Sequence, residues 1–405
     1  MTGARGVLVA LCAASVAVAG QAEWPGWRGP NRDGKSPDTN LLRAWPHGGP
    51  ALLWTADAIG GGFSSVAVAG GRVYTTGDVD GKLVLFAFDL DGKLEWKVAV
   101  DNAFRGDPPG SRATPTIDRG KLYLISGSGR ILCCDAANGK EVWASHMRDF
   151  GGRAPDWGYA ESVLIYKDMA IAKPGGQQGC ILALEKNTGT KRWQSTRFTA
   201  GAEYSSCIIA SFGGRDLVLT GTRAGIVCVD AVDGGLQWSN PWCSGNTANC
   251  PTPVMDGAYV FWANGYGTGG ICLTMRTVGG RVQADKVYTT RDMNCHHGGY
   301  IIHEGHVYGN HGGGWACLEL KTGARKWYER AVGKGSVCWA DGMLYLFSES
   351  KGRAALATCS PDGLEITGRV EVKGSGPSWA HPVVIGGRLY LRYDTHLYCF
   401  DVRAR

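Results

Sequence analysis

The chain has 405 residues and a formal net charge of +6, from 42 Lys and Arg residues against 36 Asp and Glu residues. These charges form no long run of one sign, which excludes a protein dedicated to nucleic acid binding. A hydrophobic content of 44% supplies a core and excludes a disordered chain. With 62 Gly, 15 Trp and 15 Tyr residues, the composition favours a turn-rich all-β protein.

The first 22 residues have the pattern of a secretory signal. Arg5 precedes an apolar stretch that ends in small residues and is too short to span a bilayer comfortably. No later segment approaches the roughly 20 unbroken apolar residues of a membrane helix. We therefore expect an exported protein, periplasmic or extracellular, with no transmembrane segment. Residues 23–50 are expected to form an N-terminal extension, and residues 51–405 a single domain.

A repeat runs through the rest of the chain, and its marker is a Gly followed four residues later by a Trp. The five pairs are Gly92 and Trp96, Gly139 and Trp143, Gly189 and Trp193, Gly234 and Trp238, and Gly323 and Trp327. Starting from Trp54, the intervals between these Trp residues are 42, 47, 50, 45 and 89 residues, the last being two units. A period of roughly 40–50 residues with four short strands per unit is typical of a β-propeller.

Each part of the marker has a physical reason. The Gly allows positive φ at the tip of a hairpin, where two antiparallel strands reverse. The Trp falls on the outermost strand, where an indole can fill the wedge between neighbouring blades. In the preceding strand of six repeats the central residue is Ala or Cys, as close packing requires: Ala87, Cys133, Ala183, Cys228, Cys317 and Cys399.

Counting the repeats predicts an eight-bladed β-propeller of four-stranded antiparallel blades. The blades begin near Ser64, Ala113, Glu161, Ser205, Pro251, Gly298, Gly335 and Ala380, and the fifth and seventh lack the Trp. The eighth has three strands, whereas residues 51–54 form a Trp-containing strand without a blade of its own. We expect this N-terminal strand to complete the C-terminal blade and close the ring, which also removes a sheet edge.

This repeat resembles that of the PQQ-like β-propeller family over about residues 50–405. The family includes quinoprotein alcohol dehydrogenases and BamB-like outer-membrane assembly proteins. The sequence WPGWRGPNRDG at positions 24–34 resembles the start of small secreted members. The resemblance implies the fold and leaves the function open, because one fold hosts many functions.

The cysteines favour burial more than pairing. Removing Cys12 of the signal leaves 13 of the 14, an odd number. Those at the central strand position are expected to be buried thiols. Cys243 and Cys250, in one loop, are the best disulfide candidates. A bond between Cys133 and Cys134 is disfavoured, because neighbouring side chains in a strand point to opposite faces.

Candidate site residues gather at one mouth of the predicted ring. The loops that enter the innermost strands bring Arg112, Glu161, Glu203, Tyr204, Asn249, His296, His297, Lys334, Trp379 and His381. The loops between the second and third strands open on the same face and add Arg223, His311, Lys351 and His396.

His296, His297 and His311 form the densest group, on the sixth blade. Three imidazoles within reach of one another could bind Zn²⁺ or Cu²⁺, or act as acid and base. Alternatively, they hydrogen-bond loop carbonyls and line a wet pore.

A quinoprotein site is a further alternative. PQQ with Ca²⁺ needs basic groups for its carboxylates, an aromatic face for stacking, and oxygen ligands for the cation. Arg112, Arg223 and Lys334 could be the basic groups, and Trp379 the stacking face. Glu161, Glu203 and Asn249 could supply the oxygens. Compact loops and the lack of a clear Asp base count against this alternative.

The leading hypothesis is a non-catalytic binding or scaffold protein that requires no cofactor and recognises a partner protein or a glycan at the propeller mouth. Exposed aromatic residues in residues 24–30 and the Gly-rich loops would provide platforms for such a partner. We expect a monomer.

Overall fold

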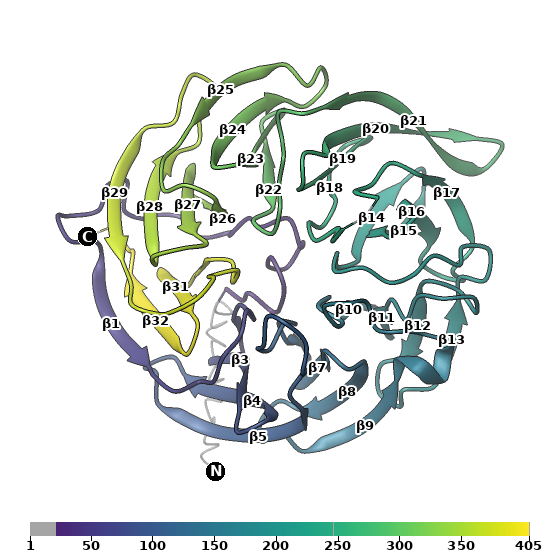
Figure 1. The fold of residues 1–405 in the computed structure, drawn as a ribbon, viewed down its shortest axis with the longest axis horizontal. Helices are drawn as coiled ribbons and strands as arrows, with labels where there is room; N and C mark the ends of the chain where they lie inside the picture. Colours follow the sequence, from purple (N-terminus) through teal and green to yellow (C-terminus); the bar gives the residue numbers. More distant parts are fainter. Residues whose placement is uncertain (1–21, 246, 405) are drawn as a thin grey trace, which may run out of the picture.

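The computed structural model describes residues 22–245 and 247–404. Eight four-stranded antiparallel sheets stand in a ring around a central axis, which confirms the predicted eight-bladed propeller (Figure 1). A 3-10 helix, η1 (Met147–Phe150), follows β9. No helix among the described residues is long and apolar enough to cross a membrane. The expected signal falls largely on residues 1–21, outside the described part of the chain.

Each of blades 1 to 4 is built from four consecutive strands. Their bounds are β2 (Ala67–Ala69), β3 (Arg72–Val79), β4 (Lys82–Asp89) and β5 (Leu94–Asn102) in blade 1; β6 (Thr116–Asp118), β7 (Lys121–Ile125), β8 (Arg130–Asp135) and β9 (Glu141–His146) in blade 2; β10 (Leu164–Tyr166), β11 (Met169–Ala172), β12 (Leu182–Glu185) and β13 (Lys191–Gln194) in blade 3; and β14 (Ile208–Phe212), β15 (Arg215–Thr222), β16 (Gly225–Asp230) and β17 (Leu236–Asn240) in blade 4.

Blades 5 to 7 repeat this order, and blade 8 combines the two ends of the chain. The bounds are β18 (Val254–Asp256), β19 (Tyr259–Asn264), β20 (Gly269–Val278) and β21 (Arg281–Thr290) in blade 5; β22 (Tyr300–His303), β23 (His306–His311), β24 (Gly314–Glu319) and β25 (Arg325–Glu329) in blade 6; β26 (Gly335–Ala340), β27 (Met343–Ser348), β28 (Arg353–Thr358) and β29 (Ile366–Glu371) in blade 7; and β30 (Val383–Ile385), β31 (Arg388–Tyr393), β32 (His396–Asp401) and β1 (Ala51–Ala56) in blade 8.

The ring closes as predicted. Strand β1 pairs antiparallel with β32, and Trp54 lies opposite Cys399. Arg392 of blade 8 fastens this closure to blade 1, where its guanidinium donates to the carbonyl oxygens of Ser64 (3.2 Å) and Gly60 (3.0 Å). Closure leaves both ends of the chain in one blade and removes the free edge of the sheet.

The repeat marker forms the contact between neighbouring blades. The Trp of one blade lies opposite the small residue of the preceding strand, as Trp143 lies opposite Cys133. Its indole then reaches the next blade, where its Nε1 donates to Lys186 O at 2.8 Å. A Cβ at Gly189 would lie 2.7 Å from this indole, and the φ of Gly189 is +74°, so both packing and backbone require Gly there. The marker therefore joins two blades rather than stabilising one.

Two blades solve the same packing problem without their own Trp. In blade 5, Tyr288 lies opposite Cys272, and its hydroxyl donates to Leu320 O of blade 6 at 2.8 Å. In blade 7 the corresponding position is Gly368, and the indole comes from Trp45 in the N-terminal segment. A Cβ added to Gly368 would lie 2.4 Å from the Cβ of Trp45. Trp45 is 6% exposed.

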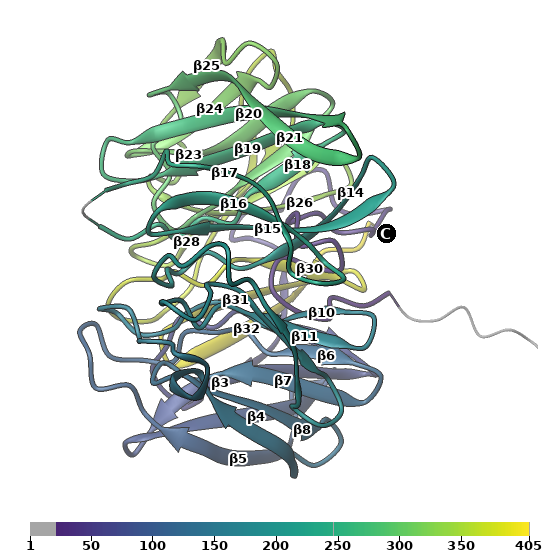
Figure 2. The same ribbon diagram turned by 90° about the vertical axis from the view of Figure 1, so that its right-hand side faces the viewer.

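Residues 24–38 cross the centre of the ring and contact all eight blades; we call them the central plug (purple in Figure 1). Their hydrogen-bond partners, from blade 1 to blade 8, are Val68, Ile117, Val163, Cys207, Thr252, Tyr300, Trp339 and Gly387. In the side view of Figure 2 the plug lies toward the hairpin turn between β14 and β15, away from the loops that precede the inner strands. It closes the channel that a ring of eight blades would otherwise leave open.

Two buried arginines hold the plug in place. Arg32 donates to Ser162 O at 3.0 Å and to Cys207 O at 2.9 Å, which ties it to blades 3 and 4. Arg28 donates to Tyr300 O of blade 6 at 2.6 Å. Burial lowers the pKa of Arg32 to about 10, so it stays charged at neutral pH.

The plug overturns one prediction from the sequence. Residues 24–30 were expected to form an exposed aromatic platform, but Trp24 is 1% exposed and pairs with Val68 of β2. Apolar burial in the channel is more favourable for the Trp24 ring than exposure to solvent. Trp24 is therefore part of the core, whereas Trp27 of the same segment is only partly buried.

The cysteines are unpaired in the described part of the chain. Cys133 and Cys134 pack into two different inter-blade clusters, as their opposite orientations predict. The predicted disulfide between Cys243 and Cys250 is wrong. Asn249 Oδ1 accepts from the Ser244 amide at 2.8 Å, which shapes the intervening loop, and Cys243 Sγ lies 3.5 Å from Arg223 O.

Candidate binding cavity at the propeller mouth

A cavity of about 270 Å³ opens at the mouth, above the plug. Its walls come mainly from the loops that precede the inner strands, in every blade except blade 7. The lining residues are Trp27, Phe63, Pro108, Arg112, Trp157, Ala160, Ser162, Tyr204, Ser206, Ala248, Cys250, Tyr266, His296, His297 and Trp379. Aromatic rings and imidazoles thus make up most of the wall.

The structure brings five of the predicted mouth residues together in this wall: Arg112, Tyr204, His296, His297 and Trp379. Other predicted residues support the wall from behind, namely Glu161, Glu203, Asn249, Lys334 and His381. His381 Nε2, for example, donates to His297 O at 2.9 Å, and its ring packs against Trp27 with centroids 4.5 Å apart.

Four aromatic residues of the wall were not assigned to the mouth from the sequence. Trp27 comes from the plug, where its Nε1 donates to Thr252 Oγ1 at 3.1 Å. Phe63 precedes blade 1, Trp157 lies in the long loop after η1, and Tyr266 lies in the turn between β19 and β20. Tyr266 sits in one of the loops already expected at this face, so the topology could have identified it.

The aromatic rings are tilted and do not form a parallel pair. Trp379 lies between Phe63, at a centroid distance of 4.5 Å and an angle of 39°, and His297, at 4.2 Å and 39°. Trp157 and Tyr204 meet at 5.9 Å and 55°. These contacting rings therefore form continuous aromatic patches along the wall.

Two aromatic side chains stand at the rim of the cavity and reach solvent. Trp157 is 38% exposed and Tyr266 is 53% exposed. The Tyr266 hydroxyl lies 2.6 Å from His296 Nε2, and the Tyr266 backbone has a φ of +57°, an uncommon value for a non-glycine residue. Tertiary contacts thus hold an apolar ring where it meets water.

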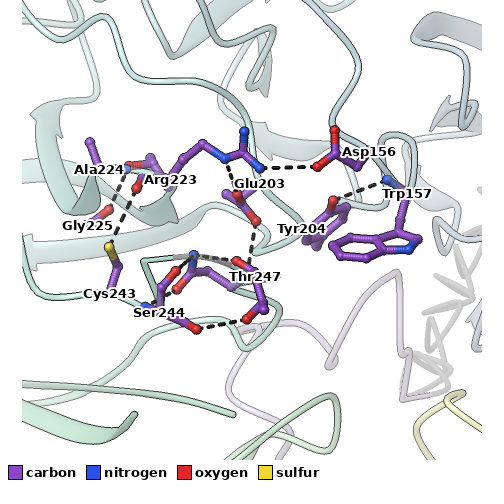
Figure 3. A network of polar contacts seen from close by, with 12 residues as sticks. Asp156, Trp157, Glu203, Tyr204, Arg223, Ala224, Gly225, Cys243, Ser244 and Thr247 are labelled. Atoms are coloured by element: carbon purple, nitrogen blue, oxygen red, sulfur yellow. Dashed lines mark hydrogen bonds and ion pairs between the residues drawn. The ribbon is translucent and has the colours of Figure 1, made fainter. Parts of the chain in front are cut away.

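Glu203 organises the rim on the side of blade 4 (Figure 3). Its Oε1 accepts from Arg223 Nε at 3.1 Å, and Arg223 Nη2 lies 3.3 Å from Asp156 Oδ2. Asp156 precedes Trp157, whose amide donates to the Tyr204 hydroxyl at 3.3 Å. This chain of contacts fixes the loop that carries Trp157.

The other carboxylate oxygen of Glu203 fixes a second wall. Oε2 accepts from the Asn249 amide at 3.1 Å, and Asn249 Nδ2 donates to Ser244 O at 3.2 Å. Ser244 also bonds Thr247 through their hydroxyls, 2.9 Å apart (Figure 3). The loop held in this way supplies Cys250 to the cavity wall. Burial raises the pKa of Glu203, and its hydrogen bonds to Asn249 and Arg223 oppose that shift.

The predicted group of three histidines does not form. The cluster in the structure contains His296, His297 and Glu349. His311 Nδ1 instead accepts from the Asn294 amide at 3.1 Å, and its ring meets Tyr328 edge-on at 5.4 Å. Glu349 lies just after β27, in the loop that also carries the predicted Lys351, and it was not singled out because that loop contains no His.

An internal cation already occupies this cluster. Lys334 Nζ lies 2.6 Å from His296 Nδ1 and 3.0 Å from Glu349 Oε1. Because Lys334 can only donate, His296 Nδ1 must accept, and Nε2 then carries the proton beside Tyr266. Burial, His297 and Lys334 lower the pKa of His296 to about 3. Burial alone would raise the pKa of Glu349, but His297 and Lys334 lower it to about 2.

These contacts do not fit a metal centre. Both nitrogens of His296 have partners, and a divalent cation would face the Lys334 ammonium. Structural and catalytic zinc sites need ligands whose lone pairs are free. The cluster is instead a salt-bridged support for the His296 and His297 walls.

The donor set proposed for Ca²⁺ and PQQ does not fit either. Glu161 accepts from the Lys173 amide at 2.5 Å and is 1% exposed, and Glu203 and Asn249 bind each other and their loops. No Asp or Glu is among the described residues that line the cavity. Calcium prefers several carboxylate or carbonyl oxygens that are free to turn toward it.

The comparisons with known proteins agree with the fold. The family model described as outer membrane protein assembly factor BamB matches residues 42–143 and 109–329. The outer membrane protein assembly factor BamB of Bordetella pertussis is 25% identical over 188 residues, 45% of this chain and 45% of that protein. The quinohemoprotein alcohol dehydrogenase of Comamonas testosteroni is 34% identical over 80 residues, 19% of this chain and 11% of that protein. The chain thus matches less than half the length of these curated relatives.

Solved structures show the same architecture. BamB from Moraxella catarrhalis superposes with a TM-score of 0.63 at 17% identity, covering 87% of this chain and 98% of that one. The Comamonas testosteroni quinohemoprotein alcohol dehydrogenase gives a TM-score of 0.70 at 14% identity, covering 95% and 81%. At these identities the likeness concerns the fold alone. Because the family model spans most of the propeller, the chain belongs to the BamB family of PQQ-like β-propellers.

Proposed function

We propose that this protein is an exported, non-catalytic recognition protein that binds a glycan or a segment of a partner protein in the mouth cavity. The aromatic wall carries the proposal. Rigid aromatic rings provide large contact areas at low entropic cost, and the two at the rim already reach solvent.

The charges around the cavity support binding over catalysis. Glu203 is paired with Arg223, and Glu349 with Lys334. A general base needs a lone pair within reach of a substrate proton, and these carboxylates are engaged in holding loops. Relatives named as outer membrane protein assembly factors also favour a binding role and an exported location.

An array of glycans and peptides tests the proposal. Labelled wild-type protein should bind a subset of spots, and Trp379→Ala and Tyr266→Ala should reduce that binding about tenfold or more. Tyr328→Ala is the matched control, because Tyr328 is 40% exposed and lies on the outer strand of blade 6. Binding that survives the cavity variants would contradict the proposal.

The similarity to a quinohemoprotein alcohol dehydrogenase favours a second candidate, a quinoprotein alcohol dehydrogenase. Incubation with PQQ and Ca²⁺, followed by absorbance and dye-linked alcohol oxidation, separates the two. A bound quinone band with turnover would overturn the non-catalytic proposal, whereas its absence under saturating PQQ would remove the enzyme candidate.

A further inference from the structure

The charge and shape of the cavity narrow the class of ligand, provided that the proposed binding function holds. Among the described residues that line the cavity, Arg112 is the only Lys, Arg, Asp or Glu. Its Nε donates to Trp157 O at 2.6 Å and its Nη2 to Pro108 O at 2.7 Å, while Nη1 donates to Gly110 O.

These bonds leave the guanidinium without a neutralising partner. All three acceptors are backbone carbonyls, and no carboxylate lies within 4.0 Å of Arg112 among the described residues. One N–H on each terminal nitrogen has no protein acceptor there, since an arginine carries five N–H donors. Asp78 is the carboxylate whose charge reaches Arg112 through space. A free pair of N–H groups suits a carboxylate, which accepts two bonds at once.

The hydroxyl groups in the wall offer donors as well. Ser162 Oγ accepts from the Thr114 amide at 3.1 Å, and Ser206 Oγ accepts from the Ser162 amide at 3.0 Å. Tyr204 Oη accepts from the Trp157 amide at 3.3 Å. Each hydroxyl therefore retains its hydrogen, with no acceptor among the described residues. No carboxylate is among the described lining residues, so the cavity suits a ligand that is rich in hydrogen-bond acceptors.

The aromatic part of the wall suits a sugar ring. Phe63 and His297 pack directly against Trp379, with ring centroids 4.5 Å and 4.2 Å away, so the three rings form one continuous patch. A pyranose presents C–H groups on its faces, which can pack on such a patch, and oxygen atoms around its edge, which polar groups of the wall can reach. Trp157 and Tyr266 at the rim would contact the next sugar of a chain.

We propose that the cavity binds the terminal hexuronate residue of an acidic polysaccharide, with the sugar carboxylate on Arg112 and the pyranose ring against Trp379, Phe63 and Trp27. The hydroxyl groups of Ser162, Ser206 and Tyr204 then donate to oxygens at the ring edge. His296 and His297 complete the wall beside Trp379.

Calorimetric titration of the full chain with methyl β-D-glucuronide, methyl β-D-glucoside and 2-naphthoate tests this proposal. The glucuronide should bind about tenfold or more tightly than the glucoside. The ratio of the two affinities should fall when the salt concentration rises from about 20 mM to about 500 mM, because salt screens a solvent-accessible ion contact. Arg112→Gln should remove the preference for the acid, whereas Arg276→Gln, an exposed arginine paired with Asp285 in blade 5, should keep it.

Each other outcome has a defined meaning. Equal affinity for glucuronide and glucoside would overturn the carboxylate contact, and tighter binding of 2-naphthoate would overturn the sugar. These comparisons use the wild-type protein, so they hold even if Arg112→Gln fails to fold. If none of the three compounds binds while the labelled protein binds spots of the array, this inference fails and the proposed function stands. If the protein binds no spot either, both fail.

Discussion

The Lys334 ammonium lies 2.6 Å from His296 Nδ1 and so takes the lone pair that a metal would need. The neighbouring Glu349 completes the arrangement at 3.0 Å from the same ammonium. His296, His297 and Glu349 have the composition of a metal site. With Lys334 paired to Glu349, however, the cluster has no net charge and supports the cavity wall.

Replacing Lys334 should reveal the hidden ligand set. Wild type and His296→Ala/His297→Ala should contain the same, negligible amount of zinc after dialysis against the metal. Lys334→Ala should bind about one zinc ion per chain, because it frees His296 Nδ1 and Glu349, which with His297 lie within 4.8 Å of one another. Elemental analysis measures this. Zinc in the wild type that disappears in the double variant would refute the account of the cluster.

The plug should behave as part of the propeller core. Arg32→Met leaves carbonyl oxygens in blades 3 and 4 without a donor, so we expect a loss of about 3 kcal/mol in the free energy of unfolding. Arg43→Gln is the matched control from the same N-terminal region, since Arg43 is 62% exposed at its salt bridge with Asp341 and should cost less than about 0.5 kcal/mol. Urea denaturation gives both values. Similar stabilities for the two variants would show that the plug is dispensable.

The indole of Trp45 should couple to the glycine of blade 7 on which it packs. Trp45→Ala should cost about 3 kcal/mol, as truncation of a buried aromatic does. Gly368→Ala should also destabilise the protein, because its Cβ would lie 2.4 Å from the Trp45 Cβ. In a Trp45→Gly background the same Gly368→Ala change should cost clearly less than in the wild type, since the contacts with the Trp45 Cβ and Cγ are gone and only the backbone N at 2.9 Å remains. Additive effects in this double-mutant cycle would contradict the packing described.

Much of this architecture is readable in the sequence because it repeats. Gly189 and Trp193 have counterparts in other blades, so a fixed spacing indicates both the hairpin tip and the outer strand. The closure by Trp54 follows from counting, since a blade with three strands and a strand without a blade require each other. Trp45 has no such counterpart in the other blades, because it fills the position of the Trp that blade 7 lacks. Its contact with blade 7 forms only when the ring is closed, so no local spacing indicates it.

The site was less predictable than the fold, because several of its residues have no counterpart in the other blades. Arg112 and Trp379 precede inner strands, so the topology places them at the mouth. Trp27 lies in the cavity because the plug crosses the channel, a path that no local pattern encodes. His311 shares a blade with His296, yet its own hydrogen bond to Asn294 directs it elsewhere.

Asp78 should make stability depend on pH. Burial raises its pKa from 3.8 to about 6, although Arg112, Arg392 and the Gly110 amide oppose the shift. A group with a raised pKa binds its proton more tightly in the folded state, so its stabilisation is present below the unfolded value and is lost as pH rises through about 6.

Asp78→Asn should therefore raise the unfolding temperature at pH about 7.5 and change it little at pH about 4. Differential scanning calorimetry at the two values checks this, with Asp285→Asn as an exposed control. A gain of equal size at both values, or a loss at the higher one, would contradict the assignment.

The most direct test of the mouth cavity as the binding site is hydroxyl-radical footprinting of the wild-type protein, with and without a glycan or peptide that it binds on the array. The account predicts that oxidation of Trp157 and Tyr266 falls when the ligand is bound, while oxidation of the comparably exposed Tyr328 stays the same. Protection of Tyr328 with none at Trp157 and Tyr266 would contradict it.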